Sequence, residues 1–265
     1  MGATVADERS VYDAFAPYYD AFTAASDYGA WTRELLGVAE RHGIRGGTVL
    51  DLACGTGKSF VGLLEHGFRV TGCDSSGAML AEAARRAPAT TLIKADVRSL
   101  PELGRFDLVT CFDDSLNYLP DDAALAAAFA GIELNLDTHG LVLFDLNSLL
   151  AYRTTFASHA FSERDGIVFA WQGSSAPDAA PGSRAEATID AFAPEPGGLY
   201  RRVTTCHVQR HFPRERVVEL LAGAGLESLG VFGVRDDCSL VEPAVETEHL
   251  KLLYTARRAK GGDAG

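Results

Sequence analysis

The stretch VLDLACGTG at residues 49–57 joins an apolar run directly to a turn that contains two glycines. A short apolar run is typical of a buried strand, and residues 58–66, which follow the turn, have helical spacing. Glycine adopts backbone angles that other residues resist, and it lets a ligand approach the main chain closely. The stretch therefore predicts a strand, a ligand-binding turn and a helix in direct succession.

The same alternation of strands and helices continues to residue 150. Further strands are expected at FRVTGCD (68–74), TTLIKAD (90–96), FDLVTCF (106–112) and GLVLFDL (140–146), with helices at 76–87 and 121–135. Strands that alternate with helices indicate βαβ units and a mostly parallel sheet. We therefore predict a Rossmann-like α/β fold with a seven-stranded sheet and helices on both of its faces.

The pattern changes near Ala151. Extended pieces at 166–173, 184–192 and 199–212 are separated by turn-rich segments, which predicts an antiparallel β insertion. A helix from Pro213 to Gly223, with proline in its first turn, and strands at 226–234 and 249–258 then resume the α/β pattern. The expected division is a helical lid at 1–40, a Rossmann-like domain at 41–150 and 213–258, and an insertion at 151–212 that covers the substrate.

Charge and composition narrow the possible partners. A net charge of −12 with no cluster of Lys and Arg argues against nucleic acid, and no apolar run approaches the roughly 20 residues that span a bilayer. The opening MGATVADERS has early acids and no apolar core, so it does not read as a signal peptide. We expect a cytoplasmic protein that acts on a small molecule without nucleic acid or membrane. The sequence leaves open whether it is a monomer or a homo-oligomer.

Two common cofactor turns do not fit the glycine stretch. A phosphate loop of the form GxxxxGK[ST] requires glycine five residues before Gly57, where Leu52 stands. A dinucleotide turn of the form GxGxxG requires a third glycine where Phe60 stands. The acid at Asp51 would repel a polyphosphate and instead suits a cationic ligand, such as the sulfonium amino acid end of S-adenosylmethionine.

The stretch resembles motif I of class I S-adenosylmethionine-dependent methyltransferases, with Ala53 where the family more often has glycine. The resemblance covers about residues 11–150 and implies that a second acid, Asp74, accepts the ribose hydroxyls, and that Asp96 bonds the adenine amino group. It implies a cofactor-binding set of Asp51, Ala53, Cys54, Gly55, Gly57, Asp74, Ser75, Met79, Asp96, Val97, Cys111 and Phe112. Alternatives stay open, since Asp74 and Asp96 also suit turns or helix caps, and Met79 suits core packing.

The N-terminal segment adds to the resemblance. YDAFAPYYD at 12–20 resembles the first helix of small-molecule methyltransferases of the glycine and amino-sugar N-methyltransferase type. Helical periodicity in residues 7–40 breaks near Pro17 and Gly29, but Tyr12 and Tyr19 share one face if the helix continues through the proline. The resemblance implies that Tyr12, Tyr19 and Trp31 close over the cofactor, whereas packing of an N-terminal helix is the alternative.

Candidate acceptor-binding residues follow the fourth and fifth expected strands, because ligands bind beyond the carboxyl ends of such strands. FDDSLNYL (112–119) and FDLNS (144–148) resemble the same subgroup. We expect Asp114, Tyr12 and Tyr118 as catalytic candidates, with Asp114 the preferred base. The expected acceptor-binding set is Asp114, Asn117, Tyr118, Asn147 and His207. A magnesium site formed by Asp113, Asp114 and Asp145 is an alternative, but we expect no metal.

These observations predict an enzyme that uses S-adenosylmethionine to methylate a nitrogen, or an oxygen, of a small molecule. The subgroup suggests natural-product tailoring, as in antibiotic biosynthesis, for example on an amino sugar. The alternatives are an O-methyltransferase acting on a hydroxylated metabolite, a non-catalytic S-adenosylmethionine-binding protein and a nicotinamide-dependent oxidoreductase.

Overall fold

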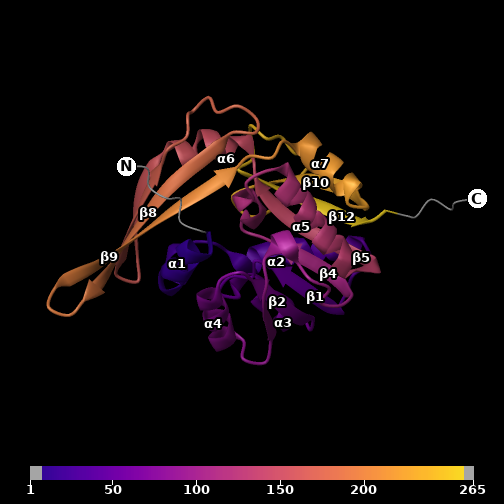
Figure 1. Ribbon diagram of the computed structural model, residues 1–265, viewed down its shortest axis with the longest axis horizontal. Coiled ribbons are helices and arrows are strands. Elements are labelled where there is room, and N and C mark those ends of the chain that lie inside the picture. The colour runs from indigo at the N-terminus through magenta and orange to yellow at the C-terminus, as the bar shows by residue number, and fades with distance from the viewer. Residues whose placement is uncertain (1–7, 260–265) are drawn as a thin grey trace, which may run out of the picture.

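The computed structural model describes residues 8–259. Figure 1 shows a main sheet covered by helices on both sides and a second sheet that extends away from it. The main sheet has the strand order β11-β10-β12-β5-β4-β1-β2-β3. Its members are β1 (Thr48–Leu52), β2 (Arg69–Asp74), β3 (Thr91–Lys94), β4 (Phe106–Cys111), β5 (Leu136–Asn147), β10 (Leu226–Val234), β11 (Leu240–Val241) and β12 (Lys251–Arg258).

The main sheet is mostly parallel, as predicted. Strands β1 to β5 run parallel, whereas β12 pairs antiparallel with β5, and β10 pairs antiparallel with β12. The expected seven strands are joined by an eighth, the two-residue β11, which is too short to be detected by periodicity. The strand order reverses between β1 and β4, so the crevice beyond their carboxyl ends is the expected ligand site.

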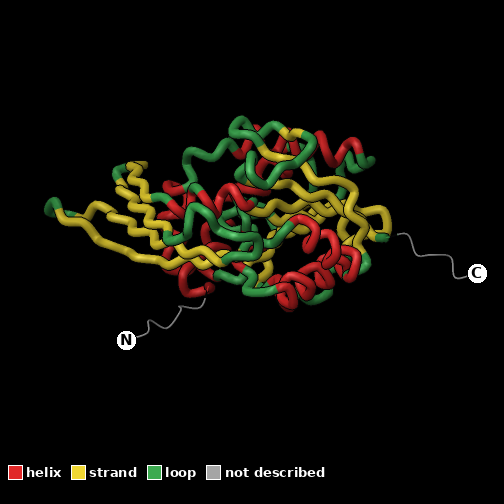
Figure 2. The backbone as a smooth tube through the Cα atoms, turned by 90° about the horizontal axis from the view of Figure 1, so that it is seen from above, coloured by secondary structure: helices red, strands yellow, loops and turns green. Residues whose placement is uncertain are grey.

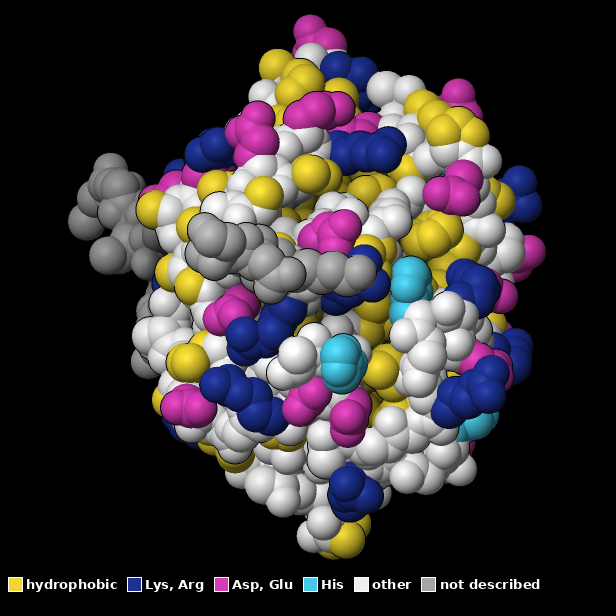
Figure 3. Space-filling model, turned by 90° about the vertical axis from the view of Figure 1, so that its right-hand side faces the viewer, with side chains coloured by type: hydrophobic (Ala, Val, Ile, Leu, Met, Phe, Trp, Pro, Cys, Tyr) yellow, Lys and Arg dark blue, Asp and Glu magenta, His cyan; other side chains and the backbone are white. Residues whose placement is uncertain are grey.

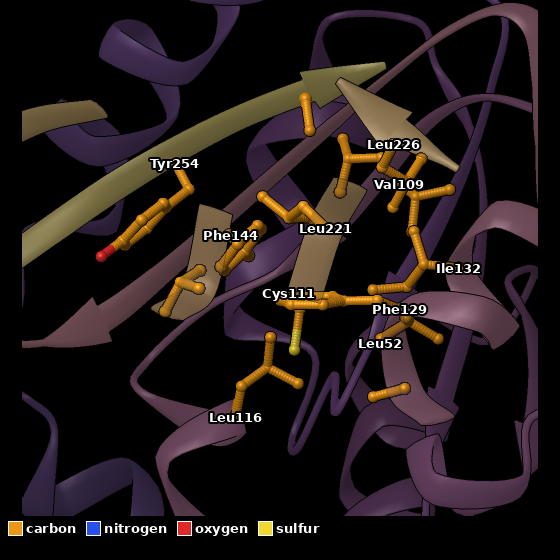
Figure 4. Close-up of a cluster of buried hydrophobic side chains, with 14 of the residues drawn as sticks. Leu52, Val109, Cys111, Leu116, Phe129, Ile132, Phe144, Leu221, Leu226 and Tyr254 are labelled. Carbon is orange, nitrogen blue, oxygen red and sulfur yellow. The ribbon is translucent and has the colours of Figure 1, made fainter. Parts of the chain in front are cut away.

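Helices cover both faces of the main sheet. Neighbouring residues of a strand, which point to opposite faces, therefore belong to different buried clusters. Leu50 of β1 lies in one cluster and Val49 in the other. Figure 4 shows the first cluster, where side chains of β1, β4 and β5 meet those of α5 and α7. The helices are α2 (Tyr28–Arg41), α3 (Lys58–Glu65), α4 (Gly77–Arg86), α5 (Asp122–Asn135), α6 (Leu149–Arg153) and α7 (Arg214–Gly223), with short 3-10 turns η1 (Val97–Ser99), η2 (Ser115–Tyr118) and η3 (Thr155–Ala157).

The predicted antiparallel insertion forms the second sheet. Its order is β6-β7-β8-β9, with β6 at His159–Arg164, β7 at Ile167–Gly173, β8 at Arg184–Glu195 and β9 at Leu199–Arg210. Figure 2 shows that the long β8–β9 hairpin projects beyond the rest of the protein. Alternate residues of β8, among them Ala187 and Ile189, are buried, so one face of this sheet packs inward.

The first helix, α1 (Glu8–Phe22), lies between the two sheets. Phe15 of α1 packs with Phe169 of β7 and Ile189 of β8, while Asp13 bonds the start of α4 through Ser76 Oγ at 2.5 Å. The expected break near Pro17 is wrong, because α1 continues through the proline and ends at Phe22. Packing against the second sheet and α4 outweighs the intrinsic cost of proline. The expected break near Gly29 lies slightly earlier, at residues 23–27 between α1 and α2. Pro213 caps α7 instead of lying in its first turn.

Of the predicted lid at 1–40, residues 1–7 lie outside the described residues, and in the described part α1 lies between the two sheets. Trp31, Leu35 and Val38 of α2 are buried in the second cluster on the main sheet, so α2 is part of the layered core. On the face drawn in Figure 3, basic and acidic side chains are interspersed. None of the described helices is long and apolar enough to cross a membrane. The division into three parts remains a prediction.

Candidate functional site

The glycine turn has left-handed backbone angles at three positions. Ala53, Gly55 and Gly57 have φ values of 51°, 52° and 84°. At Gly57 a Cβ atom would meet the Phe60 ring at 2.7 Å, so this glycine is needed for packing of the turn on α3. At Gly55 no atom lies within 4 Å of the Cβ position. Gly55 therefore leaves space in front of the main chain, as a ligand-binding turn requires.

A first cavity lies beyond the carboxyl ends of β1, β2, β3 and β4. It contains much of the predicted cofactor set, contributed by four strand ends and by α1. Its lining residues are Tyr12, Tyr19, Ala53, Gly55, Asp74, Ser75, Met79, Ala95, Asp96, Val97, Arg98, Asp113, Ser115, Tyr118 and Leu119.

Asp74 both shapes the turn and lines this cavity. The Gly55 N–H donates to its Oδ2 at 2.8 Å, and the Ser76 N–H donates to its Oδ1 at 2.8 Å. Burial raises the pKa of Asp74, although these hydrogen bonds act in the opposite direction. The predicted turn role and an exposed position on the cavity wall are thus compatible, because each carboxylate oxygen accepts more than one hydrogen bond.

Asp96 and Met79 likewise combine a structural role with a position on the wall of the first cavity. Asp96 caps η1 by accepting the Arg98 N–H at 2.9 Å and is paired with the Arg98 guanidinium at 2.6 Å, yet it lines the first cavity. Met79 is 1% exposed and also reaches the cavity wall. The turn and core alternatives therefore do not remove either residue from the site.

Asp51 is not on the cavity wall, which corrects the charge argument made from the sequence. Its carboxylate accepts hydrogen bonds from Ser59 Oγ and Thr110 Oγ1, both at 2.6 Å, and burial raises its pKa to about 6. Because both oxygens are bonded within the fold, Asp51 supports the turn from behind.

Other predicted cofactor residues also lie in the core. Cys54 and Cys111 are buried thiols whose pKa values are raised by burial, and neither lines the first cavity. Trp31 packs edge-on against Phe112, with ring centroids 5.6 Å apart. Gly57 faces Phe60. Cys54 and Phe112 are each next in the chain to a cavity residue, Ala53 and Asp113 respectively, but their own side chains are buried.

A second cavity, of about 530 Å³, is enclosed by four parts of the chain: α1, the second sheet, the carboxyl end of β5 and the start of β12. Aromatic side chains, small hydroxyl residues and charged groups line it. They include Tyr12, Phe15, Tyr19, Phe22, Asp113, Asp114, Tyr118, Asn147, Thr155, Phe156, Ser158, Ser162, Phe169, Trp171, His207, Gln209 and Lys251. Tyr12, Tyr19, Asp113 and Tyr118 line both cavities, and we call these four residues the junction.

Lys251 occupies the centre of the acidic loop after β4. Its Nζ lies 2.8 Å from Asp114 Oδ1, 3.0 Å from Asp145 Oδ2 and 3.8 Å from Asp113 Oδ1. Burial raises the pKa of Asp145 to about 6. The three acids of the magnesium alternative therefore surround an ammonium group, and the described residues contain no cluster of His, Cys, Asp and Glu that could hold a metal ion.

The acidic loop is held in an unusual backbone conformation. Asp113 and Asp114 have φ values of 56° and 51°, which are uncommon for residues other than glycine. The Asp114 N–H donates to Asp145 Oδ1 at 2.7 Å, and the Tyr28 hydroxyl donates to Asp113 Oδ2 at 2.7 Å. These bonds hold Asp113 at the junction and Asp114 beside it, where Asp114 is ion-paired with Lys251.

Tyr118 and His207 form a bonded pair on the wall of the second cavity. The Tyr118 hydroxyl lies 2.9 Å from His207 Nδ1, and Thr205 Oγ1 lies 3.0 Å from Nε2 and 3.4 Å from the Ile189 carbonyl oxygen. Burial lowers the pKa of His207 to about 4, so the ring is neutral at neutral pH. The donor and acceptor roles in these bonds follow the ring tautomer: with the ring proton on Nε2, His207 donates to Thr205 Oγ1 and accepts the Tyr118 proton at Nδ1.

Asn117 does not reach either cavity, contrary to its predicted acceptor-binding role. It is fully buried, donating to the Tyr152 hydroxyl and the Arg210 carbonyl and accepting from the Asn147 N–H at 2.8 Å. Asn147 lines the second cavity and donates to Gln209 Oε1 at 2.9 Å. Gln209 in turn donates to Asp114 Oδ2 at 2.5 Å. Asn117 thus fixes the loop from the inside.

Comparison with known proteins gives the family. Residues 49–140 match a family described as "Methyltransferase domain". The Bacillus subtilis (strain 168) protein named "Putative methyltransferase YqeM" is 31% identical over 258 residues, covering 94% of this chain and 98% of that protein. The chain belongs to the class I S-adenosylmethionine-dependent methyltransferases.

Two further proteins resemble this methyltransferase. The crystal structure of an S-adenosylmethionine-dependent methyltransferase from Clostridium acetobutylicum ATCC 824 superposes with a TM-score of 0.79 at 24% identity, covering 94% of this chain and 99% of that one. A Streptomyces fradiae dTDP-3-amino-3,6-dideoxy-alpha-D-glucopyranose N,N-dimethyltransferase is 33% identical over 119 residues, covering 45% of this chain and 47% of that protein. The chain thus spans about half of this second relative.

The first cavity fits the cofactor of this family. The open space at Gly55 admits a ligand against the main chain, Asp74 offers carboxylate oxygens, and Met79 and Val97 offer apolar surface. No lysine lines the cavity among the described residues, and its single arginine, Arg98, is paired with Asp96, which agrees with a cofactor that carries no phosphate.

Several cavity residues were missed in the sequence. Lys251 lies in the last strand, and only its antiparallel register opposite Asn147 brings it to the acidic loop. Asp113 was named only in the magnesium alternative, although it stands beside Asp114 in the same loop. Gln209, Phe169 and Trp171 carry no signal beyond their alternation in the expected extended segments, which does not say which face is inward.

Proposed function

We propose that this methyltransferase methylates the nitrogen of a small-molecule amine at the junction of the two cavities. The observation that carries the proposal is that Asp113 lies at the junction and Asp114 beside it, with Asp145 behind them. Among the described residues, Lys251 is the cation that forms ion pairs with these acids. Three carboxylates and one ammonium leave this end of the cavity negative. Such a site stabilises the positive charge that develops on nitrogen as a neutral amine becomes the ammonium product.

The proposed cofactor contacts follow from the first cavity. Asp74 would accept the ribose hydroxyls, Met79 and Val97 would pack beside adenine, and Asp96 would bond its amino group. Tyr12 and Tyr19, whose ring centroids are 6.4 Å apart, would cover the cofactor from α1 and exclude water. When bound, S-adenosylmethionine supplies an electrophilic methyl group, and a neutral amine nitrogen forms the N–C bond as the C–S bond breaks.

A nitrogen acceptor suits this site better than a hydroxyl. A hydroxyl must lose its proton to become a good nucleophile, whereas an uncharged amine already has a free electron pair. Of the cavity groups that could remove a hydroxyl proton, His207 has a pKa of about 4, and the Asp114 carboxylate already accepts from Lys251 and Gln209. Burial raises the pKa of Tyr12 well above its usual value, so this phenol stays protonated.

The Tyr118 and His207 pair would orient the acceptor. The hydrogen bond to His207 Nδ1 fixes the Tyr118 hydroxyl on the wall of the second cavity, where it would contact the amine. His207 then acts as a positioning residue that fixes the direction of the Tyr118 hydroxyl. Correct placement matters greatly here, because methyl transfer is a displacement that requires alignment of the reacting atoms.

An amino sugar is the acceptor class that we favour, as part of natural-product tailoring. The aromatic walls suit packing against an apolar sugar face, and Ser158, Ser162 and Thr155 offer hydroxyl partners. The partial relative from Streptomyces fradiae carries the name of an amino-sugar N,N-dimethyltransferase, which supports the choice.

The test uses S-adenosylmethionine with a labelled methyl group and matched pairs of acceptors that differ in one amine or hydroxyl. Glucosamine and glucose form one pair, and cyclohexylamine and cyclohexanol form another. We expect label in the amine of each pair, located on nitrogen by mass spectrometry. Label on the hydroxyl partner alone, with the amine inert, would contradict the proposal.

A further inference from the structure

A third cavity, of about 160 Å³, lies on the opposite side of β9 from the second cavity. Successive residues of β9 point to opposite faces, so Cys206, Val208 and Arg210 face this cavity, while His207 faces the second one. We call it the arginine groove, and its described lining residues are Val11, Arg98, Tyr118, Leu119, Pro120, Arg184, Cys206, Val208, Gln209 and Arg210.

Three arginines from distant parts of the chain meet in this groove. Arg98 comes from η1, Arg184 from the start of β8 and Arg210 from the end of β9. No carboxylate is among the described lining residues. In a protein with a net charge of −12, a groove lined by three guanidinium groups and no acid is a local excess of positive charge.

Two of these arginines have N–H groups without a hydrogen-bond partner among the described residues. The exposed Arg184 side chain makes no ion pair or hydrogen bond with the residues that the structure describes. Arg210 has a buried Nε without a partner, and its other contacts are long, at 3.5 Å to the Pro120 carbonyl and 3.6 Å to Asp122. Arg98 is paired with Asp96. A buried donor without a partner is costly, so a ligand that accepts from it would be favoured.

Two carboxylates outside the lining balance part of the groove's charge, whereas Arg184 has no carboxylate partner among the described residues. Asp96 is engaged by Arg98, and Asp122 is shared between Arg210 and Arg216, whose Nε lies closer, at 2.8 Å. Glu186 is close enough to help raise the pKa of the Cys206 thiol, after burial of that thiol. The Glu186 side chain is exposed to solvent, so the Glu186 charge is screened.

The groove adjoins both other cavities. Tyr118 lines all three, Arg98 and Leu119 are shared with the first cavity, and Gln209 is shared with the second. Gln209 also bonds Asp114. A group bound in the arginine groove would therefore lie next to the place where the acceptor nitrogen is proposed to bind.

We propose that the arginine groove binds a phosphate group. Guanidinium groups match phosphate oxygens in geometry as well as in charge, and the volume suits one or two phosphates rather than a whole nucleotide. Because the groove adjoins the second cavity, we favour a phosphate that is part of the acceptor molecule. This choice rests on the proposed amine methylation. A free phosphate bound independently of the acceptor is the other source.

The groove itself is tested by calorimetric titration of inorganic pyrophosphate into the full-length protein saturated with S-adenosylhomocysteine. We expect binding that weakens as salt is raised, and that becomes about tenfold weaker or more in Arg184→Ala and in Arg210→Ala. Arg164→Ala removes an exposed arginine of β6 in the same sheet and serves as the matched control, with unchanged binding. Absence of pyrophosphate binding, or equal weakening in the control, would overturn the proposal.

The source of the phosphate is distinguished by methylation of glucosamine, glucosamine 1-phosphate and glucosamine 6-phosphate. If the acceptor carries the phosphate, one phosphorylated form should have the higher kcat/KM, and Arg184→Ala should remove that preference. Pyrophosphate binding without such a preference would assign the groove to free phosphate. If no amine is methylated while pyrophosphate still binds, the proposed function fails and the groove stands.

Discussion

Asp51 and Asp74 show how two acids at neighbouring strand ends acquire different roles. In the β1–β2 register Asp51 lies opposite Gly72, so Asp74 stands two residues nearer the carboxyl edge. Asp51 is enclosed by Ser59 and Thr110, whereas Asp74 lines the first cavity. Spacing along the sequence could identify both acids, but only the register separates the supporting acid from the one that a ligand can reach.

Asp74→Asn tests the ribose assignment. The amide keeps an oxygen for the turn but loses the charge, so we expect S-adenosylhomocysteine to bind about tenfold more weakly or worse, as measured by calorimetry. Asp107→Asn is the matched control, because Asp107 also accepts a backbone N–H, that of Thr48 at 2.7 Å, but lies away from the cavities. Unchanged affinity in Asp74→Asn would remove the assignment.

His207 makes stability depend on pH. Its folded pKa of about 4 lies below the ordinary value of 6.5, so the unfolded chain takes up a proton first as the pH falls. Stability from the neutral ring is therefore complete above about pH 7 and is lost as the pH falls toward 4. Between pH 7 and pH 5 the loss amounts to about 2 kcal/mol.

His207→Asn removes this titration while keeping an acceptor for Tyr118. Urea unfolding at pH 7 and pH 5 should show a smaller drop in unfolding free energy for the variant than for the wild type, by about 2 kcal/mol. The buried acids Asp51 and Asp145, whose raised pKa values act in the opposite sense, are present in both proteins and cancel. His159→Asn, at an exposed position of β6, should behave as wild type. Equal drops in His207→Asn and wild type would refute the burial argument.

At the scale of elements, α1 connects the cofactor cavity to the second sheet. Its Tyr12 and Tyr19 rings form part of the junction, and Asp20 ties the helix to the main domain through Arg86 and through Thr56 Oγ1 at 2.6 Å. Proline in the middle of the helix lowers its intrinsic helical stability, so these contacts are needed to hold it in place. Movement of α1 is therefore expected to control release of the cofactor.

Asp20→Asn should loosen α1. The ion pair is partly exposed, so a modest effect is expected: S-adenosylhomocysteine should dissociate about two- to fivefold faster in stopped-flow measurements, with faster amide exchange in α1. Glu40→Gln, which breaks an exposed pair with Arg45 at 3.2 Å beside α2, is the control. An unchanged dissociation rate in Asp20→Asn would show that α1 does not limit release.

Much of the element pattern could be predicted from the sequence, because alternation of apolar runs with helical spacing reports directly on a parallel sheet. The continuation of α1 through Pro17 could not, since it depends on packing against Phe169 and Ile189, far away in the chain. The short β11 carries too few residues to show a period. For the second sheet, the sequence predicted strands but not the inward placement of His207 and Gln209.

At the scale of the whole molecule, two cavities built from different parts of the chain meet at four residues. The first belongs to the main sheet, whose motif residues follow strands in order, and could largely be predicted for that reason. The second combines α1, the second sheet and Lys251 of the last strand, so it depends on contacts between distant segments. Its shape and charge could not be read from local spacing, and the acceptor-binding predictions were correspondingly less accurate, as Asn117 illustrates.

The account as a whole depends on where the reactive centre of the cofactor lies, and a crystal structure with S-adenosylhomocysteine bound tests this most directly. We expect the ribose at Asp74, adenine between Met79 and Val97, and the sulfur at the junction of Tyr12, Tyr19, Asp113 and Tyr118, facing the second cavity. A sulfur atom directed away from the second cavity, or a ribose remote from Asp74, would contradict the account.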